Sequence, residues 1–329
     1  MSYRIGIDAL HLRPTPRPAH TEYCSNDALF RDLKARTGKS FNDAGEIDYL
    51  WHTDDGPVPW SARGRTTDMG HGEFVEGGGD RRESRPSPFR SVAEVLGFDA
   101  AAEYGLPDFD GLVAHYERAH AAAKAGEDLV VPGGYYKTLV SGAIEAFGWD
   151  LILEAAADRG RFERVLDSFH RLTLHHVRAW ARTSIEVFNC HDDFVWANGP
   201  WIAPDFYRAA IIPRYRELWK VLHDAGKLVV FTADGDYTLF VDDLVAAGAR
   251  GLTFEPLTSF DAVVRRHGGR IAIMGSKVDT QTLTMGSVEK IKMQVDATLD
   301  LARGLPGFFF AVGSHIPSNV PVEHARAYF

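Results

Sequence analysis

Several polar side chains stand where apolar runs of this chain end, and their types are those of acid–base or metal chemistry. Thr232 and Asp234 follow the run 229–231, Glu255 ends the run that starts at 252, and His315 follows the run that starts at 308. A carboxylate held near a histidine shifts both groups toward useful pKa values, so Asp234, Glu255 and His315 are candidate catalytic residues. The same three side chains could instead bind zinc or another divalent metal.

The apolar runs alternate with helix-like segments, which predicts a parallel α/β sheet. Strands are expected at 129–131, 185–190, 228–232, 251–255, 271–275 and 307–312, and short strands at 20–23 and 47–51 would complete eight. Helices are expected at 100–125, 149–158, 161–182, 204–225, 237–247, 259–267 and 287–303. We therefore predict one distorted (β/α)₈ TIM-type barrel over residues 1–329, with its chemistry at the carboxyl ends of the strands.

One segment does not fit the alternation of strands and helices. Residues 60–88 are rich in Gly, Arg and Thr and are too long for a simple connector. They are expected to form a lid or a hairpin over the barrel mouth. His71 lies within this segment and is a candidate substrate-binding residue.

Further candidates for substrate binding lie beside the predicted strand ends. His191 and Asp192 follow the strand at 185–190, where a carboxylate can grip a cationic or polyhydroxy ligand. Thr232 points to the same side as Asp234, because residues two apart in a strand share a face. Adjacent aromatic side chains, Tyr135 and Tyr136, together with Trp196 could stack on a planar ligand.

Composition limits the possible partners. The chain has 329 residues and a net charge of −9, which argues against nucleic acid or an anionic membrane surface as the main partner. Cys24 and Cys190 are too few for a disulfide framework, and no apolar run is long enough to span a membrane. These features predict a cytoplasmic protein. No phosphate-binding loop, dinucleotide glycine motif or nucleophile elbow follows a strand.

The second half of the chain resembles the uroporphyrinogen decarboxylase superfamily. The similar segments are residues 226–236, Glu255-Pro256, residues 273–279 and the tail 313–321, with looser similarity in the first half. The resemblance implies a distorted (β/α)₈ barrel, in agreement with the strand pattern. It also implies one of two activities, decarboxylation of a tetrapyrrole or methyl transfer that depends on a corrinoid.

The chain departs from both branches of that superfamily at particular positions. It lacks the N-terminal R-Q-A-G-R motif of the decarboxylases, and its nearest run is 12–17. The zinc motif H-x-C of several methyltransferases is replaced by Thr232 and Asp234, and Ser314 and His315 stand near the distant Cys. Residues 67–71, with Glu22, are similar to the branch that acts on methyl ethers or methylamines, which makes Glu22 a candidate substrate-binding residue.

The resemblance therefore implies a methyltransferase that moves a methyl group between a small O- or N-methyl compound and a corrinoid (cobalamin) on a carrier protein. Zinc or another divalent metal and a homodimer are further expectations. Two alternatives stay open: a decarboxylase or other lyase acting on a small carboxylic acid, for which Arg65, Lys137 and Lys277 are the candidate cations, and a ligand-binding barrel without catalysis.

Overall fold

The computed structural model describes residues 2–68, 73–75, 80–81 and 85–329. Its strands are β1 (Ala19–His20), β2 (Tyr23–Cys24), β3 (Glu73–Phe74), β4 (Asp80–Arg81), β5 (Gly133–Tyr135), β6 (Val187–His191), β7 (Leu228–Ala233), β8 (Gly251–Phe254), β9 (Ala272–Gly275), β10 (Phe308–Phe310) and β11 (His315–Ile316). Its helices are α1 (Ser2–Leu10), α2 (Asp27–Thr37), α3 (Phe41–Ala44), η1 (Trp60–Ala62), α4 (Val92–Leu96), α5 (Ala100–Tyr104), α6 (Phe109–Lys124), α7 (Val140–Phe147), α8 (Trp149–Ala155), α9 (Arg159–Ala181), α10 (Pro204–Phe206), η2 (Tyr207–Ile211), α11 (Ile212–Asp224), η3 (Thr238–Phe240), α12 (Val241–Ala247), α13 (Phe260–His267), α14 (Thr280–Met285), α15 (Val288–Leu301) and α16 (Val322–Tyr328).

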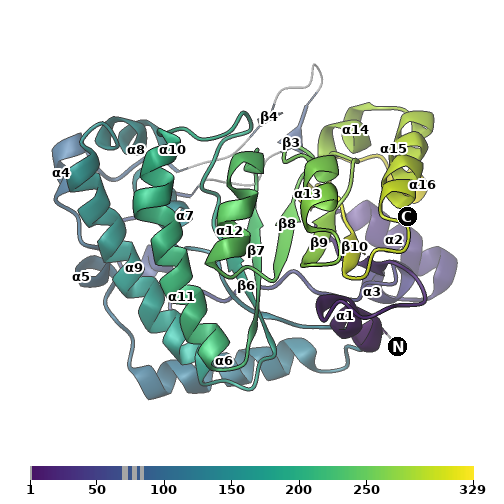
Figure 1. The fold of residues 1–329 in the computed structure, drawn as a ribbon, viewed down its shortest axis with the longest axis horizontal. Coiled ribbons are helices and arrows are strands. Elements are labelled where there is room, and N and C mark those ends of the chain that lie inside the picture. Colours follow the sequence, from purple (N-terminus) through teal and green to yellow (C-terminus); the bar gives the residue numbers. More distant parts are fainter. Residues whose placement is uncertain (1, 69–72, 76–79, 82–84) are drawn as a thin grey trace.

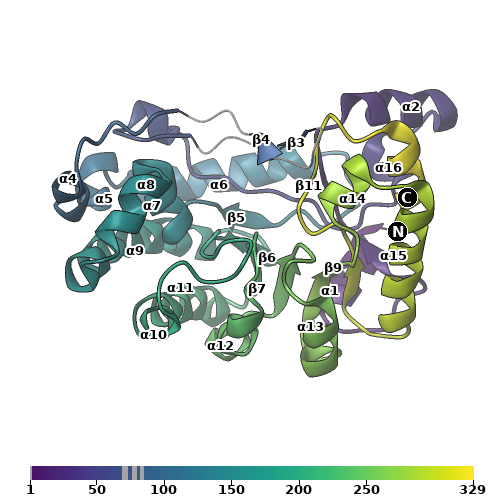
Figure 2. The same cartoon turned by 90° about the horizontal axis from the view of Figure 1, so that it is seen from above.

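Seven parallel strands form one sheet in the order β1-β10-β9-β8-β7-β6-β5 (Figures 1 and 2). Residues 48–50 join its two edges. The Asp48 amide donates to His20 O at 2.8 Å, and on the other side the Leu50 amide donates to Val130 O at 2.9 Å. This segment is the eighth strand, so the predicted barrel is confirmed.

The inside of the barrel is filled at its amino-terminal end by apolar side chains. Alternate strand residues point inward, and α1 adds side chains from below. The interior cluster is Ile7, Ala9, Leu10, Ala19, Tyr49, Val130, Val187, Val230, Ala272, Met274 and Phe309. The much larger cluster between the sheet and the outer helices holds those helices against the strands.

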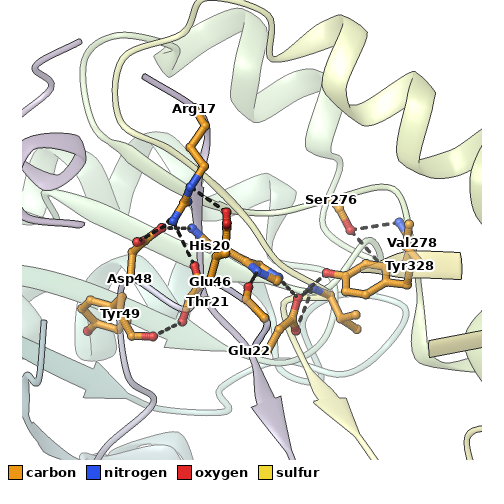
Figure 3. Close-up of polar contacts among 12 residues, drawn as sticks. Arg17, His20, Thr21, Glu22, Glu46, Asp48, Tyr49, Ser276, Val278 and Tyr328 are labelled. Carbon is orange, nitrogen blue, oxygen red and sulfur yellow. Dashed lines mark hydrogen bonds and ion pairs between the residues drawn. The ribbon is translucent and has the colours of Figure 1, made fainter. Parts of the chain in front are cut away.

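Arg17 holds the closing strand in place (Figure 3). Its guanidinium donates to both carboxylate oxygens of Asp48, at 2.6 and 3.0 Å, and pairs with Glu46 at 2.9 Å. The Asp48 carboxylate is completely buried, so this ion pair is desolvated on one side. Arg17 therefore joins the segment before β1 to the strand that closes the ring.

Two predicted segments are wrong in detail. The helix expected at 100–125 is broken into α5 and α6, because Gly105 has φ 72° and Asp108 caps a new helix by accepting from the Gly111 amide. The strand expected at 129–131 lies further along the chain, since β5 covers Gly133–Tyr135. A Cβ on Gly134 would lie 2.5 Å from His52 O, so only glycine lets the neighbouring strand approach.

The predicted hairpin is confirmed within its described residues. Strands β3 and β4 pair antiparallel, with Glu73 opposite Arg81. Ser318, beyond β11, donates to Glu73 Oε1 at 2.7 Å, which places β3 on the side of the strand carboxyl ends (Figure 1). His71 lies outside the described residues. No helix in the described ranges is long and apolar enough to span a membrane.

Candidate active site

The carboxyl ends of β6 and β7 are joined by an acidic side chain. On β6 the inward-facing positions are 187, 189 and 191, and on β7 they are 230, 232 and 234. Asp193 continues the β6 series, and its Oδ1 accepts from the Asp234 amide at 2.9 Å. On the next strand, Glu255 Oε1 accepts from the Gly235 amide at 2.7 Å. The predicted residues Asp234 and Glu255 therefore lie on adjoining strand ends.

Asp193 is the centre of a small hydrogen-bond network. Its carboxylate also contacts His191 Nε2 at 3.2 Å, and the Tyr136 hydroxyl donates to its second oxygen at 3.2 Å. The backbone amide of Asp193 donates to Ser141 Oγ at 2.6 Å, which fixes the carboxylate in place. The Tyr136 ring lies 4.4 Å from the His191 ring, centroid to centroid. An imidazole, a carboxylate and a phenol thus meet at the barrel mouth.

The environment gives these groups complementary proton affinities. Burial raises the pKa of Asp193, but the charge of His191 and the hydrogen bonds outweigh it, so the net shift is downward. Burial, helped by the Asp193 charge, raises the pKa of Tyr136 well above its ordinary value. Asp193 is therefore an anion and Tyr136 a neutral proton donor at neutral pH.

A lysine stands beside this network. Lys137 Nζ lies 3.6 Å from Asp55 Oδ2 and 3.8 Å from Glu145 Oε1, and its ammonium lies 4.8 Å from the centre of the Tyr136 ring. Burial raises the pKa of Glu145, and the Lys137 charge opposes that shift. The cationic charge of Lys137 is thus balanced by carboxylates of the chain itself.

His315 belongs to a different part of the rim. It starts β11, which pairs with β2, and its Nε2 lies 2.6 Å from Ser25 Oγ. Its ring packs on Tyr23 at 4.7 Å, and Tyr23 stacks on Trp51 at 6.0 Å. Among the described residues, no three His, Cys, Asp or Glu side chains come close enough to hold a metal ion. The predicted set of Asp234, Glu255 and His315 therefore does not fit a zinc site in this part of the chain.

Three residues predicted to bind substrate are buried in internal contacts. Tyr135 is fully buried and stacks on His176 of α9 at 4.8 Å, on the outer side of β5. Asp192 accepts from the Val140 and Ser141 amides at 3.2 and 2.6 Å, and from the Tyr215 hydroxyl at 2.5 Å.

The third of these residues is Glu22, which lies between β1 and β2. Its carboxylate contacts His20 Nε2 at 3.2 Å and accepts from the Val312 amide and the Tyr328 hydroxyl (Figure 3). The described contacts of Tyr135, Asp192 and Glu22 are internal and support the fold, and the role of these three residues in substrate binding stays a prediction.

The remaining predicted residues face the mouth. Trp196 is 42% exposed on the rim, and its ring packs on Trp149 at 5.5 Å. Thr232 is nearly buried, and its hydroxyl donates to Asn189 Oδ1 at 2.6 Å. Tyr136 and His191 belong to the Asp193 network.

The sequence places Asp193 beside Asp192 in the polar turn after the strand, but only Asp192 is selected there as a candidate and Asn189 is not singled out, although a signal for both is present. They alternate with Cys190 and Asp192 along β6, so the same rule that grouped Thr232 with Asp234 also groups Asn189, His191 and Asp193.

The closed parallel barrel, with its polar groups at the strand carboxyl ends, places this chain among the TIM-type barrel proteins. The sequence model of the uroporphyrinogen decarboxylase (URO-D) family matches residues 149–329, more than half of the chain. The chain therefore belongs to the uroporphyrinogen decarboxylase family, whose members are enzymes.

Similar proteins carry two different names. The chain is 27% identical over 165 residues to a uroporphyrinogen decarboxylase of Syntrophotalea carbinolica and 24% identical to one of Pelobacter propionicus. Each match covers 50% of this chain and 46% of the relative, so the chain spans about half the length of the curated relatives it matches. A methyltransferase from Methanosarcina mazei has the same fold, with a TM-score of 0.67, 16% identity, and coverage of 99% of this chain and 96% of its own.

Proposed function

We propose that this chain is a methyltransferase that moves a methyl group between a small O- or N-methyl compound and a corrinoid on a carrier protein. The observation that carries the proposal is the network of Asp193, His191 and Tyr136 at the barrel mouth. Demethylation leaves an oxygen or nitrogen that must gain a proton, and this network offers a proton donor beside a charged partner. Asp234 and Glu255, on the adjoining strand ends, add two carboxyl groups beside this network, and we call this pair the acidic wall.

In this proposal, Asp193, His191 and Tyr136 have different roles. Asp193 Oδ1 lies 3.2 Å from His191 Nε2, and this contact orients the imidazole ring at the barrel mouth. Tyr136 stays neutral and donates a hydrogen bond. Such proton transfer typically accelerates a reaction by about 10²–10⁴-fold. A bound corrinoid would supply the group that accepts or gives the methyl.

The rim has the chemical character that a flat corrin ring requires. Trp196 is exposed on one side, and the stacked rings of Trp51, Tyr23 and His315 lie on another. Aromatic faces bind planar macrocycles by stacking and by burial of apolar surface. These residues would hold a corrinoid presented by a carrier protein.

The name of the curated relatives favours a decarboxylase as the second candidate. A tetrapyrrole with several carboxylates needs cationic partners, but Arg17 pairs with Asp48 and Glu46 at the amino-terminal end of the barrel. Lys137 is balanced by two carboxylates, and Lys277 is hydrogen-bonded to Asp261 on α13. Arg65 pairs with Glu103 on α5, at 3.0 Å. These four cations therefore give this second candidate little support.

One experiment distinguishes a methyltransferase from a decarboxylase by measuring the product of each reaction. Under anaerobic conditions the protein is given reduced cobalamin with guaiacol, methanol or dimethylamine, and the methylated cobalamin is followed by its absorbance. Carbon dioxide release from uroporphyrinogen is measured in parallel. Methyl transfer that is lost in Asp193→Asn and kept in Asp243→Asn, which removes a surface partner of Arg208, supports the proposal. Unchanged transfer in both Asp234→Ala and Glu255→Ala refutes the role of the acidic wall.

A further inference from the structure

Asn189 and Thr232 form the floor of the barrel mouth. They occupy inward-facing positions on the adjacent strands β6 and β7. Two residues earlier on the same strands, Val187 and Val230 belong to the apolar cluster inside the barrel. One step above them, His191 and Asp234 belong to the mouth. A ligand that enters the mouth therefore meets the side chains of Asn189 and Thr232 at its deepest point.

The hydroxyl of Thr232 sets the orientation of the Asn189 amide. The distance from Thr232 Oγ1 to Asn189 Oδ1 is 2.6 Å. This length is usual for an O–H···O bond and shorter than an N–H···O bond, which has a typical range of about 2.7–3.2 Å. The carbonyl of the amide therefore accepts from Thr232, and the NH₂ group is turned away from it.

The NH₂ group of Asn189 is unpaired but accessible. The residue is 3% exposed, and its amide nitrogen donates to no side chain or backbone atom of the described residues. The Tyr49 hydroxyl, deeper in the barrel, is both unpaired and sealed from solvent, whereas the Asn189 nitrogen is not sealed. An amide donor with neither a protein partner nor solvent contact is destabilising, so the mouth itself must provide a partner, either water or a ligand.

We propose that Asn189 is a specificity residue whose NH₂ group donates to an oxygen acceptor at the buried end of the substrate. The NH₂ group offers only donors, and an ammonium group has no lone pair with which to accept a hydrogen bond. The floor therefore selects a methyl ether or an alcohol over a methylated ammonium ion. This inference rests on the proposed methyl transfer and narrows its substrate class from O- or N-methyl to O-methyl compounds.

In this proposal the Thr232 hydroxyl holds the Asn189 amide in one orientation. Removing its hydroxyl frees the amide to rotate and present its carbonyl to the mouth. A net hydrogen bond is worth about 0.5–1.5 kcal/mol, and 1.4 kcal/mol is a factor of ten in affinity. Thr232→Val is therefore expected to weaken binding of an O-methyl ligand by up to about tenfold, while Thr232→Ser keeps the hydroxyl and stays within about twofold.

The test observes the amide directly. The protein is labelled with [¹⁵N]asparagine, and the Asn189 side-chain resonances are identified by their absence from Asn189→Asp. Guaiacol and methanol are titrated as oxygen probes, and tetramethylammonium and trimethylammonium as cationic probes. We expect the oxygen probes to shift the Asn189 resonances to saturation, with the weaker affinity in Thr232→Val, and the ammonium probes to leave them unchanged.

Opposite outcomes overturn the inference. A shift caused by the ammonium probes, no shift with either oxygen probe, or equal oxygen-probe affinity in Thr232→Val and Thr232→Ser each contradicts it. If Asn189→Asp does not fold, the Thr232 pair still decides, with resonances assigned by Asn189→Gln. If the oxygen probes bind but no methyl transfer occurs, only the proposed function is refuted. If methyl transfer occurs and is unaffected in Thr232→Val and Asn189→Gln, only the role of Asn189 is refuted.

Discussion

The Asp193 network allows a prediction in which stability and activity separate. Asp193→Asn preserves the size of the side chain and one carbonyl oxygen. That oxygen can take the place of Oδ1 and keep the contacts to the Asp234 amide and to His191. The new NH₂ group then faces the Tyr136 hydroxyl, which can accept where it formerly donated. All three contacts survive, so we expect the free energy of unfolding to fall by no more than about 1 kcal/mol.

Asp193→Ala provides the contrast, because it removes the acceptors altogether. The Tyr136 hydroxyl and the Asp234 amide then lose their partner in a region where Asp193 is only 12% exposed. Each unpaired buried donor costs about 1–3 kcal/mol, so we expect a loss of about 2–6 kcal/mol. Both variants remove the negative charge beside His191, and both should lower methyl transfer by roughly 10²–10⁴-fold.

The assays are urea denaturation at several pH values and the anaerobic transfer rate. The pKa of Asp193 lies below its ordinary value, so the stability it contributes is present above about pH 4 and is lost as the pH falls further. Wild type and Asp193→Asn should therefore converge in stability between pH 7 and pH 3. Equal destabilisation by Asn and Ala would refute the hydrogen-bond reasoning, and full activity in Asp193→Asn would refute the chemical role.

Three further predictions concern the supporting structure. Arg17→Met removes the ion-pair partner of the buried Asp48 carboxylate and should lower the free energy of unfolding, measured in urea, by about 3–5 kcal/mol. The control is Arg13→Met, whose ion pair is exposed and whose loss should cost less than about 1 kcal/mol. Burial raises the pKa of Asp192 to about 6, so the protonated form is favoured on folding, and wild type should lose roughly 3 kcal/mol relative to Asp192→Asn as the pH rises from about 3 to about 7 in the same assay. Tyr135→Phe removes a hydroxyl that has no partner in the described structure and should leave both the transfer rate and the urea midpoint unchanged or slightly raised.

The barrel strands of the second half could be predicted because they lie between the barrel interior and the outer helices. A parallel strand is covered on both faces, so it is a continuous apolar run, and β7, β8 and β9 each begin or end within about two residues of the prediction. Helix α7 was missed because all of its residues are buried, which removes the polar face that reveals a helix. The short strands before residue 50 depend on contacts with distant segments, as in the bonds of residues 48–50 to both neighbours.

The site was predicted at the level of the strand ends but not of each side chain. Tyr135 and Tyr136 are adjacent and Asp192 and Asp193 are adjacent, yet in each pair one side chain faces the helices and the other the mouth. A one-residue difference in the assumed end of a strand exchanges these roles. The surroundings of His315 could not be predicted for another reason: β11 leaves the barrel and pairs with β2, a topology that the local sequence does not encode.

The most direct test of the central claim is the product balance of the wild-type protein with reduced cobalamin and an O-methyl compound. Guaiacol is incubated with the protein under anaerobic conditions, and methylated cobalamin and catechol, the demethylated product, are quantified by mass spectrometry. We expect both products to appear in a ratio of one to one, at a rate that falls with Asp193→Asn. Binding of guaiacol with no methylated cobalamin, or carbon dioxide release from a carboxylic acid in its place, would contradict the central claim.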